Sequence, residues 1–283
     1  MDSEKIIKNY NAGSLRLGLI GTIKLFLSEI HSSRFVIWYL FKRDFVAQFR
    51  QKILGYFWIV IAPFMAILPF IFLHRVGIFN PGTLDMPYPV FIVMGLGIWN
   101  LLTSSFTIVS TGLQNNEDLI KRTNIPKITF AITGMANIFY NAGIHCIVIL
   151  IFGFILGVTP SVWAIVYPFT LLAIIIFGFG LGLLFSVIGT VARDLSSMVL
   201  SFLNLVMFIS PVVYKPNFGN NFLDTVVFWN PFTYLVELPR SVFVFGDWSM
   251  AKGFLLALIF AFGLVLLGLY SFYLIKDSVA QQL

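Results

Sequence analysis

Two stretches of this sequence hold polar residues whose types and spacing could form a catalytic or binding site. In the segment NPFTYLVELPR, Glu237 and Arg240 are three positions apart. A carboxylate and a guanidinium at this spacing on a short helix most often form a local ion pair, although the same pair at an outer membrane surface could serve catalysis. The second stretch places four polar residues at i, i+3, i+4 and i+8, on one face of a helix: Asn137, Tyr140, Asn141 and His145.

Other chemical signatures are missing from the sequence. There is no GxxxxGK[ST] phosphate loop, so the chain cannot bind ATP in that way, and no HExxH, CxxC or His/Cys cluster offers a metal site. The 12 acids lie in loops and in the N-terminal tail, mostly beside basic residues. We therefore predict no catalytic site, no metal and no cofactor in this chain.

His145 is the only mid-span candidate for an ionisable group, and we expect a neighbouring carbonyl to satisfy it. Transporters driven by protons or ions usually carry ionisable residues within their spans. A chain without them and without a phosphate loop must take its energy from another protein if it moves a substrate.

The amino-acid composition indicates the class of protein to which these residues belong. Of 283 residues, 59% are hydrophobic and 11% are charged, whereas soluble domains carry about a quarter charged residues. The chain is therefore predicted to be an all-α integral membrane protein. Nine of the 18 Lys and Arg residues precede residue 56, three lie in 114–127, and one each lies at Arg193 and Lys276. This asymmetry predicts that both termini and two short loops are cytoplasmic, and it does not support nucleic-acid binding.

Hydropathy predicts six spans, since a helix needs about 20 apolar residues to cross a bilayer. They cover approximately 57–74, 88–113, 128–157, 161–191, 195–214 and 250–275. The third and fourth exceed one crossing and are expected to protrude or bend. The segment 215–249 contains Pro231, Pro239 and Gly246, and neither half reaches spanning length without a breaker. We predict two short re-entrant helices dipping in from the outer face, with a plain outer loop as the alternative.

Before the first span, the sequence predicts a helix lying on the membrane surface over residues 35–50. Large apolar residues recur there at steps of three or four, with basic residues largely between them. Its candidate interfacial residues are Trp38, Lys42, Arg43, Asp44 and Arg50. Residues 1–30 are predicted to be a polar cytoplasmic extension, and residues 31–283 a single transmembrane domain.

The inner loop Gln114–Lys127 has helical content of its own. Asn115 or Asn116 is expected to cap a short helix, Glu117 and Asp118 favour its positive end, and Pro126 follows its close.

Polar residues also recur on spans two and five, as Thr103, Thr107 and Thr111, and as Ser197, Ser201 and Asn204. They could pack helices together by hydrogen bonding or line a pathway. Aromatic residues near span ends, including Trp99, are expected to anchor the membrane interface, and some could line a carbohydrate path.

Five motifs in order resemble the membrane subunits of type-2 ABC exporters, especially their bacterial polysaccharide-export branch. They are RDF(x)4RQKILGYFW, NNEDLIKRTNIPK, VARDLSSM, SPVVY and NPFTYLVELPR, and the resemblance covers residues 35 to 276. The resemblance implies a homodimer in which each copy docks a separate ATP-binding subunit, giving two copies that hold ATP and Mg²⁺. It assigns coupling to that ATPase to one set of residues: Asn116, Glu117, Asp118, Leu119, Ile120, Lys121, Arg122, Arg193 and Asp194.

The resulting prediction is a non-enzymatic, multi-pass pore in the bacterial cytoplasmic membrane, surrounded by lipid, that exports a lipid-linked polysaccharide of the O-antigen, teichoic acid or capsule type. The candidate path residues are Trp99, Thr103, Thr107, Asn137, Tyr140, Asn141, Ser201 and Asn204. The candidate outer gate comprises Trp229, Pro231, Tyr234, Glu237, Pro239 and Arg240. The alternatives are a type-2 ABC exporter of a drug or lipid, an enzyme of glycolipid synthesis that uses Glu237 and Arg240, and a passive channel.

Overall fold

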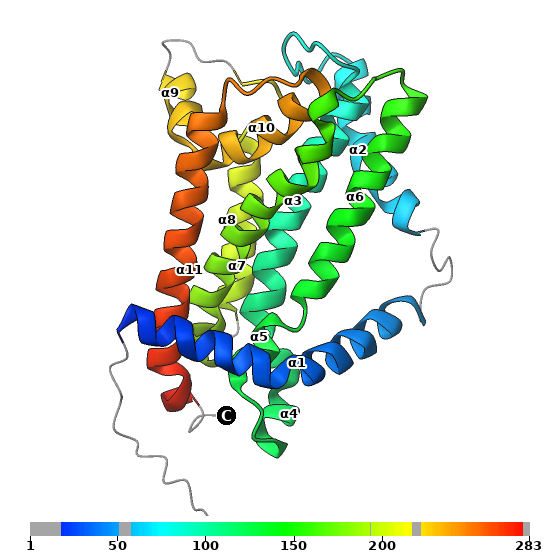
Figure 1. Ribbon diagram of the computed structural model, residues 1–283. Coiled ribbons are helices and arrows are strands. Elements are labelled where there is room, and N and C mark those ends of the chain that lie inside the picture. Colours follow the sequence, from blue (N-terminus) through cyan, green and yellow to red (C-terminus); the bar gives the residue numbers. More distant parts are fainter. Residues whose placement is uncertain (1–17, 51–57, 193, 217–221, 280–283) are drawn as a thin grey trace, which may run out of the picture.

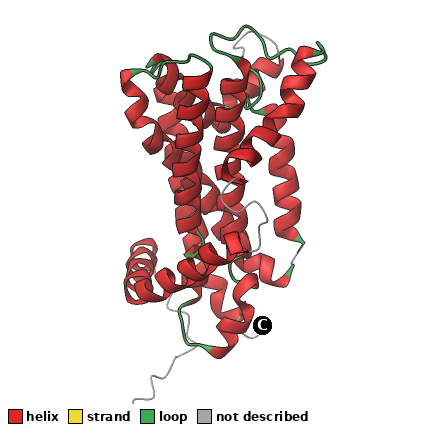
Figure 2. Ribbon diagram, turned by 90° about the vertical axis from the view of Figure 1, so that its right-hand side faces the viewer, coloured by secondary structure: helices red, strands yellow, loops and turns green. Residues whose placement is uncertain are grey.

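The computed structural model describes residues 18–50, 58–192, 194–216 and 222–279. These residues form helices joined by loops, and none of them forms a strand (Figure 2). The predicted all-α class is therefore confirmed. Four stretches within this part of the chain are long and apolar enough to cross a membrane: Tyr88–Thr111, Lys127–Ile155, Val162–Gly189 and Ala251–Leu274. Two shorter apolar helices, Ile61–Arg75 and Leu195–Ile209, accompany them.

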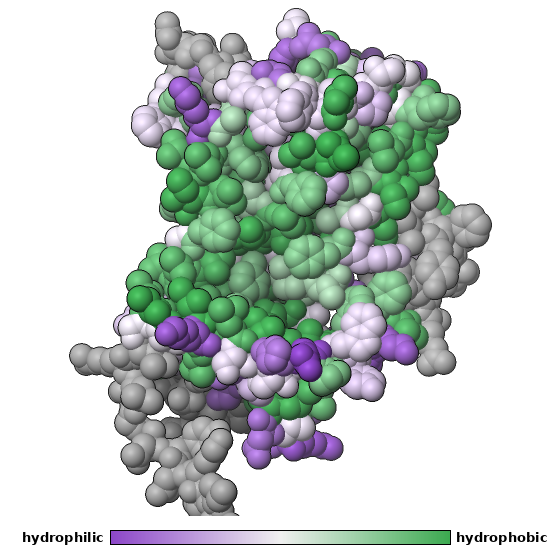
Figure 3. Space-filling view, viewed as in Figure 1, coloured by the Kyte–Doolittle hydropathy of each residue, from purple (hydrophilic) through white to green (hydrophobic). Residues whose placement is uncertain are grey.

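The long helices run side by side along one direction of the molecule (Figure 1). They are α2 (Trp58–Arg75), α3 (Tyr88–Thr111), α6 (Met135–Ile155), α7 (Tyr167–Val191), α8 (Leu195–Ile209) and α11 (Ala251–Val279). The face seen in Figure 3 is apolar across its middle and polar at its two ends. This banding matches a bilayer between two aqueous layers, and the chain is a multi-pass membrane protein.

Different short elements gather at the two ends of this bundle. One end carries α1 (Leu19–Arg50), η2 (Gln114–Asn116), α4 (Glu117–Arg122) and α5 (Lys127–Ile132), together with the end of α11 (Figure 1). The opposite end carries η3 (Val162–Val166), α9 (Phe222–Trp229) and α10 (Pro231–Phe245). We call these the α4 end and the α10 end.

Helix α7 forms the centre of the bundle because it packs against both α3 and α11. A Cβ atom at Gly178 would lie 2.6 Å from the carbonyl oxygen of Leu102 on α3. A Cβ atom at Gly180 would lie 2.8 Å from the backbone nitrogen of Val265 on α11. Small residues allow helix backbones to approach closely within a membrane, so alternating glycines on α7 bring it against both neighbours.

The third apolar stretch is interrupted, in agreement with the expectation that it exceeds one crossing. Helix α5 ends at Ile132, and α6 begins at Met135. A Cβ atom on the intervening Gly134 would collide with the side chain of Ile108 on α3. The break therefore lies where the chain passes close to α3, and it lets α5 leave the line of α6 at the α4 end (Figure 1).

The surface helix is longer than the range 35–50 predicted from the sequence, since α1 begins at Leu19. Its first half is held against the bundle by a buried or half-buried face that includes Thr22, Phe26 and Ser33. The Tyr273 hydroxyl of α11 donates a hydrogen bond to Glu29 Oε2 at 2.6 Å. This packing explains why a segment of weak amphipathic character is helical. Residues 1–17 lie outside the described part of the chain.

The segment between α8 and α11 contains two short helices, as predicted, and of Pro231 and Pro239 only Pro231 lies at a helix boundary. Pro231 is the first residue of α10, which is capped by the Asn230 side chain accepting from the Phe232 backbone N–H at 3.0 Å. Gly246 ends α10 in the left-handed conformation, with φ of 70°. The prediction that Pro239 also breaks the segment is wrong, because Pro239 lies inside α10. It is buried, and its packing outweighs the usual cost of an interior proline, about 3 kcal/mol.

Candidate functional site

At the α4 end, Asn116 ties the surface helix to the loop between α3 and α5. Its Oδ1 accepts a hydrogen bond from Arg43 Nη2 at 3.3 Å, and its Nδ2 donates to the carbonyl oxygen of Gly112 at 2.9 Å. The predicted side-chain cap is not formed, although Asn116 occupies the N-cap position of α4. The amide instead connects three segments, and α4 starts from the preceding turn of η2.

Helix α4 has one face turned into the protein and one turned away from it. Leu119 and Ile120 are half-buried and pack against the core cluster that contains Phe130. Asp118, Lys121 and Arg122 are exposed, and Lys121 Nζ pairs with Glu117 Oε1 at 2.7 Å across one turn. The result is a short, firmly seated helix that presents charges of both signs to the surroundings.

The turn between α7 and α8 lies beside this loop. Gln114 Nε2 donates a hydrogen bond to the carbonyl oxygen of Gly189 near the end of α7, so the start of η2 is fastened to that end of the helix. Asp194, at the start of α8, is exposed. Arg193 lies outside the described residues. The structure therefore brings together two segments that the sequence assigned to coupling but could not place side by side.

Helix α1 contributes the third part of this surface. Arg43 Nε pairs with Asp44 Oδ1 at 2.8 Å while its Nη2 donates to Asn116. Lys42 is exposed, and Trp38 is 60% exposed, as expected of a helix that places an aromatic residue at a membrane interface. The Arg50 side chain lies outside the described part of the chain. Hydrogen bonds thus join α1, α4 and the α7–α8 turn into one surface, which holds the residues predicted to couple to an ATPase, and we call it the coupling surface.

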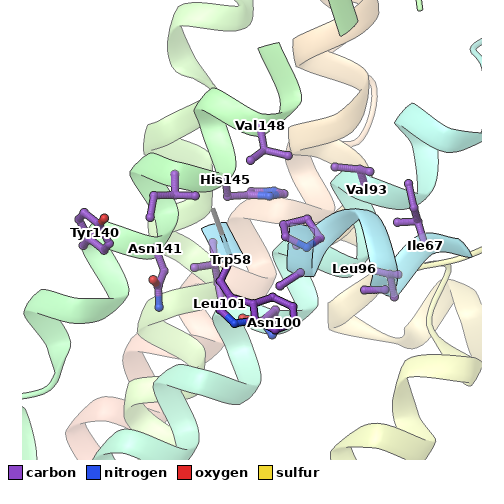
Figure 4. A pocket seen from close by; sticks show the side chains of 15 residues that line it. Trp58, Ile67, Val93, Leu96, Asn100, Leu101, Tyr140, Asn141, His145 and Val148 are labelled. Carbon is purple, nitrogen blue, oxygen red and sulfur yellow. The ribbon is translucent and has the colours of Figure 1, made fainter. Parts of the chain in front are cut away.

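A cavity of about 400 Å³ lies between α2, α3 and α6 (Figure 4). Of its lining, α2 contributes Trp58 and apolar residues, and α3 contributes Asn100 among apolar neighbours. Helix α6 contributes Tyr140, Asn141 and His145. The Tyr140 ring also meets the Phe45 ring of α1 edge-on, with centroids 4.8 Å apart, so the cavity is in contact with the coupling surface.

His145 is fixed by a different partner from the carbonyl that was expected. Its Nε2 lies 3.0 Å from the Tyr167 hydroxyl, at hydrogen-bonding distance. Gly97 of α3 lies against the ring, and a Cβ atom there would collide with it. The phenol can act as donor or acceptor, so a neutral histidine is accommodated between three helices.

Of the eight predicted path residues, only Tyr140 and Asn141 line the cavity. Trp99 is 3% exposed and packs edge-on against Phe232, with centroids 5.2 Å apart, so it is a core residue and not an interfacial anchor. Thr103 bonds to the carbonyls of its own helix, and Thr107 and Asn137 are half-buried. Ser201 and Asn204 are exposed on α8.

Sequence reasoning missed Asn100, which lines the cavity from α3. Its Oδ1 accepts a hydrogen bond from Ser104 Oγ at 3.2 Å. Asn100, Thr103 and Thr107 stand at i, i+3 and i+7, so the helical spacing of the threonines could have pointed to it.

Glu237 and Arg240 lie inside the protein, not at the outer surface. Glu237 is 7% exposed and Arg240 is 1% exposed. The Arg240 guanidinium pairs with Glu237, donates to the carbonyl oxygens of Pro211 and Val212 at 3.3 and 3.0 Å, and lies 3.6 Å from the Phe91 ring centroid. Both charged groups are thus occupied by structural contacts, which removes the basis for the catalytic interpretation.

Of the other predicted gate residues, Pro239 is buried, and Pro231 and Tyr234 are half-buried. Trp229 is 78% exposed at the end of α9. The Tyr234 hydroxyl donates to the carbonyl oxygen of Phe228 at 2.9 Å, and its ring lies against Gly253 of α11. Helix α10 is therefore fixed to α9, α11 and the end of α8, and the exposed aromatic residue is carried by α9.

Comparison with known proteins identifies this arrangement. A family model described as ABC-2 type transporter matches residues 36–244, from α1 to the end of α10. The chain belongs to the ABC-2 type transporter family. The matched range of this ABC-2 chain includes the whole cavity, α4, the α7–α8 turn and the second half of α1.

Relatives of this ABC-2 chain match it over most of both chains. The O-antigen export system permease protein RfbA of Klebsiella pneumoniae is 26% identical over 212 residues, covering 72% of this chain and 78% of the relative. The polysialic acid transport protein KpsM of Escherichia coli is 26% identical over 213 residues, covering 73% and 80%. RfbA of Myxococcus xanthus is 23% identical over 187 residues, covering 66% and 70%. Membership in this family makes the chain a membrane component of a transporter.

Proposed function

We propose that this chain is the membrane subunit of an ATP-driven exporter of a polysaccharide, and that the polysaccharide is lipid-linked. The observation that carries the proposal is the similarity to permeases named for O-antigen export and polysialic acid transport, which extends over most of both chains. The sequence has no phosphate loop of its own, which supports a separate ATPase as the source of energy.

The proposed topology has six crossings, which in chain order are made by α2, by α3, by α5 together with α6, by α7, by α8 and by α11. Two of these helices, α2 and α8, are shorter than the rest. The α4 end faces the cytoplasm, because the N-terminal region and the 114–127 loop carry most of the Lys and Arg residues. Both termini are then cytoplasmic, and α9 and α10 enter the outer leaflet of the cytoplasmic membrane and return.

In this proposal the coupling surface receives the ATPase. Helix α4 is seated by Leu119 and Ile120 and offers charges outward, so a push on it is transmitted to the bundle and not absorbed by a mobile loop. Two copies of the chain and two ATPase subunits form the exporter, with two-fold symmetry placing the export path between the copies. Nucleotide binding can shift the equilibrium between the closed and open states of the exporter only by as much as the affinity for the nucleotide differs between the two states.

The test reverses a charge on α4 in cells that depend on this chain for a surface polysaccharide. Glu117→Lys should stop export and leave the glycan inside the cell, because it removes the pair with Lys121 and changes the sign presented to the ATPase. An exposed helical ion pair contributes only about 0.3–0.5 kcal/mol, so the protein should still insert at normal levels. Arg122→Glu should act alike.

Asp85→Lys is the matched control, since Asp85 is an exposed acid that pairs with Lys215 at 2.6 Å and belongs to the loop between α2 and α3, which lies at the α10 end (Figure 1). Its export should remain close to that of the wild type. Full surface display in the double variant Glu117→Lys/Arg122→Glu would remove α4 from the docking site.

A further inference from the structure

The cavity between α2, α3 and α6 has a polar side and an apolar side (Figure 4). The polar side consists of Asn100, Tyr140, Asn141 and His145, and most of the remaining lining is apolar. Its volume of about 400 Å³ lies within the range of sites that bind small molecules, about 300–1,000 Å³. A lining of this composition suits a ligand with one hydrogen-bonding end and one hydrocarbon end.

The lining carries no formal charge of either sign from Lys, Arg, Asp or Glu among the described residues. An anionic group entering it would lose its hydration without gaining a cation, and such a transfer is strongly unfavourable. As far as the described residues go, this lining therefore favours uncharged headgroups over phosphate and carboxylate groups. Uncharged ligands do not meet this penalty.

The polar groups suit hydroxyl groups in particular. Each asparagine amide offers two N–H donors and an acceptor oxygen, and a hydroxyl can both donate and accept. Asn100 Oδ1 is engaged by Ser104, and His145 Nε2 is engaged by Tyr167. These contacts hold two of the polar groups in place.

Helix α2 carries apolar side chains both inside and outside the cavity. On α2, Pro63 and Ala66 line the cavity, while the neighbouring Phe64 and Met65 are exposed. An alkyl chain lying along α2 would thus pass from a protein-lined environment to a lipid-facing one without meeting a charged residue. A free, fully hydrophilic sugar has no hydrocarbon chain that could pack against the apolar lining.

We propose that this cavity binds the uncharged, hydroxyl-bearing headgroup of an amphiphile, with the headgroup against Asn100, Tyr140 and Asn141 and the chain along α2. The ligand is a glycolipid or a glycerolipid, which share vicinal hydroxyls on a hydrocarbon chain. The inference rests on the proposed function only for the role of the site in export. Binding is measured without ATP or an ATPase, so the two proposals can fail separately.

The experiment uses the full chain in lipid nanodiscs and three photoreactive probes with the same diazirine-bearing alkyl chain. Their headgroups are glucose, glycerol and phosphate. We expect saturable labelling of α2 and α6 peptides by the glucose probe, the glycerol probe or both, and at least tenfold weaker labelling by the phosphate probe. Glucose-selective labelling assigns the site to glycolipid, and glycerol-selective labelling assigns it to glycerolipid.

Asn141→Leu keeps the side-chain size and removes the amide, and it should weaken saturable labelling about tenfold. Asn204→Leu is the matched control on the exposed face of α8, and it should label like the wild type. Tyr140→Phe keeps the ring that meets Phe45 and removes only the hydroxyl, so it tests the headgroup contact in a second fold-preserving variant, with an expected loss of about threefold.

Equal labelling by the phosphate probe would overturn the proposal, because it would show that charge is not excluded. Labelling that does not saturate, or that is unchanged in both cavity variants, would show ordinary lipid contact and would also overturn it. Loss of export in cells with intact probe binding would instead count against the proposed function alone.

Discussion

Replacing Arg240 by Met should destabilise the protein more than any comparable change at an exposed arginine. The guanidinium is buried among Glu237, two backbone carbonyl oxygens and the Phe91 ring. Methionine fills much of the same space but provides no donor. The variant therefore leaves a buried carboxylate and the carbonyl oxygens of Pro211 and Val212 without their hydrogen bonds.

The expected loss follows from the burial of the pair. Removing one partner of a buried ion pair costs about 3–5 kcal/mol, because the remaining charge is left uncompensated. For a domain of about 150–250 residues, 1 kcal/mol corresponds to about 2–4 °C in Tm. We therefore expect Tm to fall by about 6–20 °C. The double variant Glu237→Leu/Arg240→Met should recover part of this loss, because neither charge then remains buried.

Thermal unfolding of the purified protein can be followed with a maleimide dye, because Cys146 is the single cysteine of the chain and is partly buried in α6. The matched control is Arg75→Met, at the exposed end of α2, which should change Tm by no more than about 2 °C. If Arg240→Met unfolds with the wild-type Tm, or the double variant is no more stable than Arg240→Met, the pair does not fix α10 as described.

Three further changes test other contacts. Gly95→Ala should lower Tm by several degrees, because the new methyl group would collide with the Arg240 guanidinium and the adjacent carbonyl; an unchanged Tm would contradict this packing. Tyr273→Phe should cost about 1 kcal/mol and speed amide hydrogen exchange in the first half of α1, where Glu29 loses the hydrogen bond from Tyr273; unchanged exchange would show that this hydrogen bond does not hold α1 in place. Arg43→Met should reduce ATP-dependent export with little loss of Tm, since its bond to Asn116 is exposed; full export would separate α1 from coupling.

Hydropathy and periodicity were sufficient to predict the helical class and the positions of the long helices. These signals are local, because each helix must cover its own apolar length of bilayer. They also predicted the two short helices of the α10 end, where Pro231 begins a helix as its missing N–H allows.

Side-chain partners could not be predicted in the same way, because they depend on helices that are distant in sequence. Asn116 suits a helix cap by type, but Arg43 of α1 competes for its oxygen. His145 bonds a phenol of α7. The Glu237–Arg240 pair was recognised as a pair, while its burial arises from α3 and the end of α8.

The candidate path was predicted from polar faces of single helices, and the cavity shows the limit of that reasoning. Tyr140 and Asn141 of α6 line the cavity because α2 and α3 lie opposite them, and their place in an export path stays a prediction. Trp99 was misplaced because its neighbour Phe232 comes from α10. A polar stripe indicates an interior face, but the structure decides whether a helix or a cavity lies against it.

The most direct test of the proposed function reconstitutes this chain with its ABC ATPase in sealed vesicles supplied with a radiolabelled lipid-linked polysaccharide. The glycan should move across the membrane only when both subunits and hydrolysable ATP are present, and Glu117→Lys should abolish the movement while leaving the vesicles sealed. Movement without nucleotide, or movement by this chain alone, would contradict the account.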